Sequence, residues 1–236
     1  MIKEALQYII SAFQGSETKE VASQVFSAQP LNLIEQATPD AVKVHNLNGL
    51  IDYVKSNYDD QPPVLIQVAS PTEVNVMSTY NRDMQRNVLL TAKALLPTIP
   101  FERFHDVESF NVLLQSCFVR NDHRDDLLKV VGNIREEAVQ TVGDDGISQM
   151  VTARSGVATV SAVVVPNPVL LKPFRTFVEI TQPESAFVFR MKNGPSAALF
   201  EADGGAWKLR AIADIKDYLK DELDEQIQSG RVVIIG

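Results

Sequence analysis

The stretch that decides the fold is PNPVLLKPFRTFVEITQPESAFVFRMKNGPSAALFEADGGAW, residues 166–207. Within it, the runs 174–180, 186–191 and 197–202 are rich in Phe, Val, Thr and Ile, a composition typical of β-strands. Gln182-Pro183-Glu184 and Asn193-Gly194-Pro195 separate the runs and supply residues that tight turns need. The stretch therefore predicts an antiparallel meander of three strands.

Alternation within these runs predicts how the meander is buried. In the middle run, Phe187, Phe189 and Met191 fall on one face and Val188 and Arg190 on the other. Because both faces carry apolar bulk, we expect cover on more than one side, from helices, a second sheet or another subunit. Asp203-Gly204-Gly205 then ends the strand pattern and leads into an amphipathic helix, with Asp203 as a cap or turn residue.

The chain on either side of this stretch predicts further strands and helices. That last helix has an acidic outer face and the apolar positions Ile212, Ile215, Leu219, Leu223 and Ile227, and residues 231–235 form a closing strand. Before the meander, residues 138–142 and 147–153 predict a hairpin around Gly143-Asp144-Asp145-Gly146, and residues 156–165 continue as strand.

Residues 46–134 predict a first small sheet with helices. Asn46 is a suitable N-cap for a helix over 47–58, and strands follow at 64–69 and 73–77. Residues 87–96 favour a third strand, with a helix as the alternative. Two amphipathic helices come next, one from Asp106 to about Phe118 and one over 125–134, and they can cover one sheet face together.

The amino-terminal residues predict a separate segment. Ile2, Leu6, Ile9, Ile10 and Phe13 recur at helical spacing, with Gly15 as a stop signal. The positions Val21, Val25 and Phe26 suggest a second helix or helix-like turn before a loop that extends to Pro39. We therefore expect an N-terminal helical segment over 1–45, which could act as an intersubunit arm, and a single domain over 46–236. The predicted fold class is α+β, with mixed, largely antiparallel sheets (an N-terminal three-strand region and a C-terminal meander) covered by amphipathic helices.

Composition limits the classes of function. With 236 residues, 45% of them hydrophobic, the chain can bury a substantial core. Its apolar runs are far shorter than the roughly 20 residues that cross a bilayer, and we expect neither a signal peptide nor membrane binding, but a cytoplasmic protein. The net charge of −8 disfavours nucleic-acid binding, which needs clustered Lys and Arg. The single cysteine, Cys117, lies on a predicted apolar helix stripe and is expected to be a core thiol.

Few residues suggest chemistry. Asp144 and Asp145, joined by Asp203 if the fold brings it near, could hold a divalent cation, but a solvated hairpin tip explains the first two as well. His45, His105 and His123 could act as ligands or acid–base groups only if the fold converges them; otherwise they are loop or cap residues. The aromatic residues of 174–207 could stack bases, but their pattern favours a core. We accordingly assign no catalytic, cofactor-binding or metal residues and expect no cofactor.

The carboxy-terminal half resembles a known group of proteins. The segments 166–177, Gln182-Pro183-Glu184-Ser185 with Phe187 and Phe189-Arg190, and 198–207 are similar to uncharacterised proteins of tailed phages and prophages of Gram-positive bacteria. More distantly, the chain resembles the YfdQ-like prophage family, a domain of unknown function, in which a segment like 47–58 precedes the first strands. The resemblance covers most of the chain from Asn46 onward and assigns no catalytic residues.

Three hypotheses for function follow. The first is a phage or prophage accessory protein in the host cytoplasm that acts non-enzymatically, by self-assembly into a homo-oligomer or by binding a phage or host protein. The second is an anti-defence protein that sequesters a small nucleotide-type ligand. The third is a metal-dependent hydrolase that uses Asp144, Asp145 and Asp203.

Overall fold

The protein, seen in a computed structural model, is divided into two compact units, Met1–Thr38 and Pro39–Gly236. The structure describes residues 2–14, 18–21, 24–27, 38–132, 139–144, 149–153, 161–164, 167–192 and 196–236. The division precedes residue 45 because β3 (Val42–Val44) pairs with β6 (Arg86–Lys93) and so belongs to the second unit.

The first unit contains one helix and one hairpin among its described residues. Helix α1 (Ile2–Gln14) confirms the predicted amphipathic helix. Strands β1 (Thr18–Val21) and β2 (Gln24–Ser27) pair antiparallel, with Thr18 opposite Ser27. The predicted second helix around Val21, Val25 and Phe26 is therefore wrong. Its helical spacing rested on three residues, whereas Val, Thr and Phe in two short runs suit paired strands better.

The larger sheet of the second unit has five strands in the order β14-β4-β5-β6-β3. Its further strands are β4 (Val64–Ser70), β5 (Glu73–Tyr80) and β14 (Val232–Ile235). Strands β4, β5 and β6 form the antiparallel three-strand region that the sequence predicts, which decides the 87–96 run in favour of a strand. The edge strands β14 and β3 are parallel to β4 and β6.

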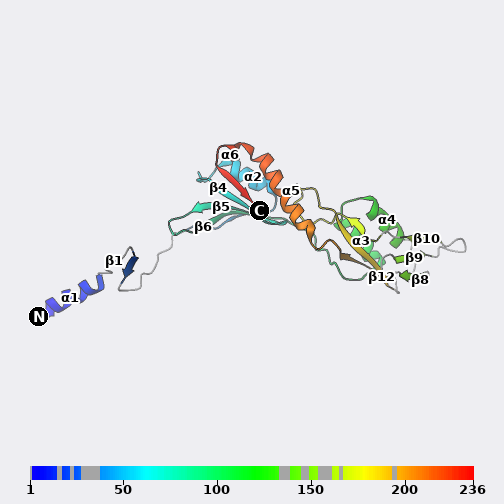
Figure 1. The fold of residues 1–236 in the computed structure, drawn as a ribbon, viewed down its shortest axis with the longest axis horizontal. Coiled ribbons are helices and arrows are strands. Elements are labelled where there is room, and N and C mark those ends of the chain that lie inside the picture. The colour runs from blue at the N-terminus through cyan, green and yellow to red at the C-terminus, as the bar shows by residue number, and fades with distance from the viewer. Residues whose placement is uncertain are drawn as a thin grey trace. The chain divides into compact units, whose positions relative to one another are not determined.

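Two helices cover one face of this sheet, as Figure 1 shows. Helix α2 (Leu47–Ser56) begins where predicted, because the side chain of Asn46 accepts a hydrogen bond from the Gly49 amide. Helix α5 (Ala206–Glu222) packs beside it, and the short α6 (Asp224–Gln228) follows a break at Leu223. The core between helices and sheet is built of buried aliphatic side chains: Leu47, Leu50, Ile51, Val54, Ile66, Val68, Val74, Val76, Leu90, Ile215, Leu219, Leu223 and Val232.

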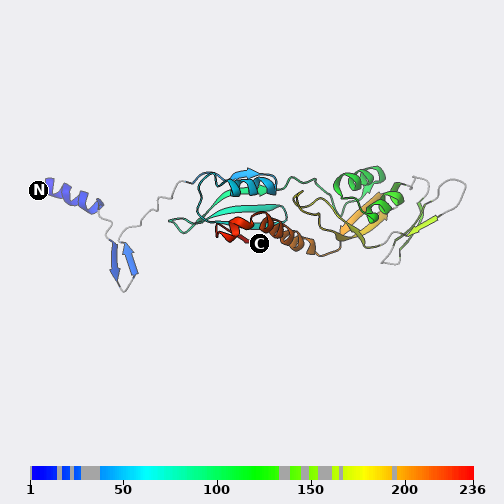
Figure 2. The ribbon, with the colours of Figure 1, turned by 90° about the horizontal axis from the view of Figure 1, so that it is seen from above.

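A second core lies on a four-stranded sheet in the order β11-β12-β13-β7. Its strands are β11 (Val169–Leu171), β12 (Ser185–Lys192), β13 (Ser196–Glu201) and β7 (His105–Asp106). Helices α3 (Val107–Cys117) and α4 (Asp122–Gly132) cover it, as Figure 2 shows. As predicted, Phe187, Phe189 and Met191 point into this core, and Cys117 is buried in it.

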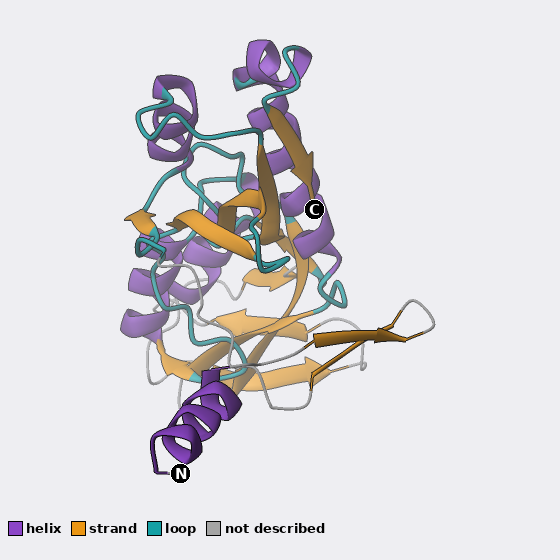
Figure 3. Cartoon of the chain, turned by 90° about the vertical axis from the view of Figure 1, so that its left-hand side faces the viewer, coloured by secondary structure: helices purple, strands orange, loops and turns teal. Residues whose placement is uncertain are grey.

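A third, three-stranded sheet has the order β10-β9-β8. It consists of β8 (Val139–Asp144), β9 (Gln149–Ala153) and β10 (Ser161–Val164), all paired antiparallel. The predicted hairpin is thus confirmed. Figure 3 distinguishes the helices, strands and loops of the chain, which together confirm the α+β class.

The run 174–180 is not a strand, so this part of the predicted meander is wrong. Residues 174–184 form a loop, here called the bridging loop, between β11 and β12. Five of its backbone groups bond to one side chain: Gln182 accepts from the amides of Arg175 and Thr176 and donates to the carbonyls of Thr176, Phe177 and Ile180. A buried glutamine supplies both donors and acceptors, so no partner strand is needed.

Candidate functional site

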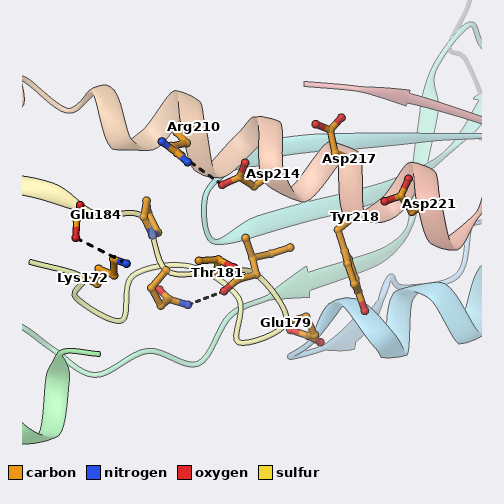
Figure 4. A pocket seen from close by; sticks show the side chains of 12 residues that line it. Lys172, Glu179, Thr181, Glu184, Arg210, Asp214, Asp217, Tyr218 and Asp221 are labelled. Carbon is orange, nitrogen blue, oxygen red and sulfur yellow. Dashed lines mark hydrogen bonds and ion pairs between the residues drawn. The ribbon is translucent and has the colours of Figure 1, made fainter. Parts of the chain in front are cut away.

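A cleft of about 540 Å³ lies between α5 and the bridging loop. Figure 4 shows Arg210, Asp214, Asp217, Tyr218 and Asp221 of α5 on one side, and Glu179, Thr181 and Glu184 of the bridging loop on the other. Lys172, which directly follows β11, also lines the cleft. The cleft thus lies between helix α5, which covers the five-stranded sheet, and the bridging loop, which joins two strands of the four-stranded sheet.

Helical periodicity places the α5 residues in the cleft. The buried positions Ala211, Ile215 and Leu219 hold one face of α5 against the five-stranded sheet. Residues at 210, 214, 217 and 221 recur every three to four positions and therefore share a neighbouring face. The acidic outer face that the sequence predicts for this helix is in part a cleft wall.

The opposite wall is fixed to α2 by a carboxylate. Glu179 Oε1 accepts hydrogen bonds from the amides of Leu47 (2.8 Å) and Asn48 (3.2 Å), the first residues of α2. A carboxylate is favourable there because the first amides of a helix have no partner within the helix. Glu179 adds to the Asn46 cap, so two side chains from distant parts of the chain close the same helix end.

Tyr218 joins α5 to α2 at the end of the cleft. Its hydroxyl donates a 2.8 Å hydrogen bond to Asn48 Oδ1. Burial, followed by the negative charges of Glu222 and Glu179, raises the pKa of Tyr218 above its usual value. The phenol therefore stays protonated and serves as a hydrogen-bond donor at neutral pH.

The charge of the cleft is negative. Five carboxylates line it, Glu179, Glu184, Asp214, Asp217 and Asp221, against the two cations Lys172 and Arg210. The cations lie across the cleft from each other in two long ion pairs, Lys172–Glu184 at 3.8 Å and Arg210–Asp214 at 3.9 Å. Such a surface attracts positively charged groups and repels phosphates. It gives no support to capture of a nucleotide at this cleft.

A buried cation lies at the base of the bridging loop. Arg175 is only 7% exposed, and its guanidinium carbon lies 3.9 Å from the ring centroid of Trp207. Nη1 donates to Glu201 Oε1 at 2.9 Å, and Nη2 donates to the Ser185 hydroxyl and to the Pro183 carbonyl. Burial lowers the pKa of Arg175 to about 10, although Glu201 and Asp203 oppose the shift, so the side chain is charged at neutral pH.

The three histidines that the sequence singles out bond to separate backbone groups. His45 Nδ1 lies 3.0 Å from the Lys93 carbonyl and His105 Nε2 lies 3.3 Å from the Pro100 carbonyl. His123 Nδ1 accepts a hydrogen bond from the Leu170 amide at 3.0 Å. Each imidazole thus has a local bonding role. Over the described residues, no group of three or more His, Cys, Asp or Glu side chains is arranged to hold a metal ion.

The aspartates of the hydrolase hypothesis are only partly within the described residues. Asp144 ends β8, and Asp145 lies outside the described residues. Asp203 Oδ1 accepts from the Gly205 amide at 3.0 Å, and Oδ2 lies 3.4 Å from the Trp207 amide. Asp203 therefore has the turn and capping role that its sequence position predicts.

Sequence reasoning did not find the cleft. Its signal is the spacing of Arg210, Asp214, Asp217 and Asp221 along one face of a helix, but that pattern also fits a solvated surface. The loop wall could not be found, because the run 174–180 predicts a strand.

None of the described helices combines the length and the apolar composition that a bilayer span requires. No protein-family model, curated protein or solved structure matches the sequence or the fold.

Proposed function

We propose that this chain is a phage or prophage accessory protein that acts non-enzymatically, by self-assembly or by binding a partner protein. The sequence resemblance of residues 166–207 to phage and prophage proteins supports the setting. The proposed mode of action, self-assembly or partner binding, rests on the exposed apolar stripe of α1. Ile2, Leu6 and Ile9 are 81%, 53% and 53% exposed.

The stripe has the spacing of a helix-pairing seam. Positions 2, 6 and 9 are separated by four and three residues, and Phe13 continues the series in the sequence. This is the 3.5-residue repeat by which helices pack side by side. A helix of 13 residues is also marginally stable alone in water, so packing against another surface would stabilise it. Both arguments favour burial of α1 in an assembly.

Light scattering coupled to gel filtration tests the self-assembly half of the proposal. We expect the full chain to run as a multiple of its 26.1 kDa mass and the double variant Leu6→Glu/Ile9→Glu to run as a single chain. The control, Gln7→Glu/Ser11→Glu, adds the same charge on the opposite face of α1 and should assemble like the wild type.

Pull-down from a phage-infected lysate tests partner binding. The tagged full chain and the two double variants are compared, and a captured protein that disappears only with Leu6→Glu/Ile9→Glu supports the proposal. A wild-type chain that stays single at every concentration and captures no protein through α1 contradicts it.

The cleft favours a second contact, with a basic segment of a partner. Thermal-shift measurements with oligolysine, compared with cyclic nucleotides, test this contact because a ligand that binds only the folded state raises the melting temperature. We expect a salt-sensitive rise with oligolysine, abolished in Asp214→Asn/Asp217→Asn/Asp221→Asn and kept in the control Asp52→Asn/Asp126→Asn/Asp224→Asn. A rise with a cyclic nucleotide alone would favour ligand sequestration instead.

A further inference from the structure

The bridging loop leaves one core and enters the other. The strands at its two ends, β11 and β12, belong to the four-stranded sheet. Phe177 and Ile180, in the middle of the loop, are 1% and 6% exposed and pack instead with the helices and strands of the five-stranded sheet. The loop therefore connects the two cores through its side chains.

Side-chain hydrogen bonds hold the loop at this position. Besides the five bonds of Gln182, the Thr176 hydroxyl donates to the Pro71 carbonyl at 2.6 Å, between β4 and β5. Glu179 holds the amino end of α2. Thr176 and Glu179 thus bond to elements of the larger core. The base of the loop bonds to the smaller core, where the Phe174 amide donates to the Cys117 carbonyl at 2.9 Å.

Arg175 joins the base of the loop to elements of both cores. Its guanidinium stacks on Trp207 in the first turn of α5, the helix that covers the five-stranded sheet. The same group bonds to Glu201 and Ser185, at the ends of β13 and β12 in the four-stranded sheet. Arginine suits this position, because its planar group can stack on an aromatic ring and donate several hydrogen bonds at once.

We propose that the bridging loop is a latch between the two cores, pinned by Arg175, which opens as a unit while both sheets stay folded. The loop has no strand ladder to either sheet, so it can leave the larger core without breaking a strand pairing. Side-chain contacts and single backbone hydrogen bonds hold it in place. Opening withdraws Phe177 and Ile180 from the larger core. It also removes one wall of the acidic cleft, so the state of the latch controls access to that surface.

Hydrogen exchange of individual amides tests the latch. The reporters are the amides of Arg175 and Thr176, which bond to Gln182, and the references are β4 and β5 amides in the antiparallel ladder. We expect Arg175→Met to speed exchange of the reporters at least tenfold and to leave the references unchanged. The control Arg120→Met, which removes an 81% exposed arginine that does not line the cleft, should change neither set. Reference amides that accelerate equally, or reporters that do not accelerate, overturn the proposal.

The wild-type chain supplies a test that does not depend on a variant that folds. In the wild type, the reporter amides should exchange through an opening with a weaker urea dependence than that of the β4 and β5 amides. Trp207 is the only tryptophan, so its fluorescence reports the stack directly and should change in Arg175→Met but not in Arg120→Met. Reporter amides that exchange in the wild type only through global unfolding overturn the proposal.

Discussion

The hydroxyl of Tyr53 donates a 2.8 Å hydrogen bond to Asp59 Oδ2 and thereby ties helix α2 to the turn that follows it. Burial of the phenol, the hydrogen bond to Asp59 and the negative charge of Asp59 raise the pKa of Tyr53 to about 12. The folded state therefore holds this proton more tightly than the unfolded state, in which an ordinary tyrosine has a pKa near 10.

This difference predicts a loss of stability at high pH. The contribution of Tyr53 is fully present below pH 10 and is lost as the pH rises from about 10 to about 12, because only the unfolded state releases the proton readily there. Tyr53→Phe should be less stable than the wild type by about 1 kcal/mol at pH 8, and the difference should shrink toward pH 11.5. Urea midpoints across this range measure it, with the 88% exposed Tyr58 changed to Phe as the control. Parallel losses in wild type and Tyr53→Phe would contradict the assignment.

Gln182 should be among the most sensitive polar positions of the chain. Gln182→Ala leaves the buried amides of Arg175 and Thr176 without an acceptor, and we expect a loss of about 2–4 kcal/mol in the free energy of unfolding. Urea denaturation measures the loss. Gln115→Ala, on the exposed face of α3, is the matched control and should change stability by less than about 0.5 kcal/mol. Equal effects of the two substitutions would rule out the role of Gln182 as the support of the bridging loop.

Glu179 should stabilise α2 from outside the helix. Glu179→Ala removes the acceptor for the Leu47 and Asn48 amides, with an expected loss of about 1 kcal/mol. Glu179→Gln keeps an oxygen at the same distance from the backbone, so it should recover more than half of that loss. Circular dichroism and urea melts of the two variants provide the comparison. Equal stability of both variants would show that the oxygen acceptor at position 179 contributes nothing.

Cys117 should react slowly with thiol reagents in the folded protein. It is the last residue of α3, its side chain is buried in the second core, and it is the one cysteine of the chain. Labelling with an aromatic disulfide should therefore be at least about 100-fold slower in buffer than in denaturing urea, since the core strands and helices must open first. A rate that is the same in both solutions would show that the thiol is accessible.

Local sequence patterns predicted those elements whose residues serve a single core. Helix α2 follows its N-cap Asn46, and β12 follows the alternation of Phe187, Phe189 and Met191, because in both cases one face meets one interior. The strand predicted over 174–180, now part of the bridging loop, was wrong because its residues serve two cores. Its Phe177 belongs to the larger core, whereas Phe187, ten residues on, belongs to the smaller one, and no periodicity in a single run describes that division.

The cleft could be predicted only in part. The α5 carboxylates occupy one helix face, which the sequence shows, but the identity of the opposite wall depends on where the bridging loop lies. Glu179 shows why the loop wall could not be predicted from local sequence. It bonds to residues 131 and 132 positions earlier, a contact that arises from tertiary packing alone.

The place of β14 in the larger sheet bears on how the protein emerges from the ribosome. This strand pairs with β4, although the whole second core is encoded between them. Until β14 leaves the exit tunnel, the backbone of β4 has an unoccupied edge on that side, which nascent neighbours or chaperones can contact. The larger sheet is therefore completed by a pairing of long sequence separation, and closure of that edge should be among the slower events of folding.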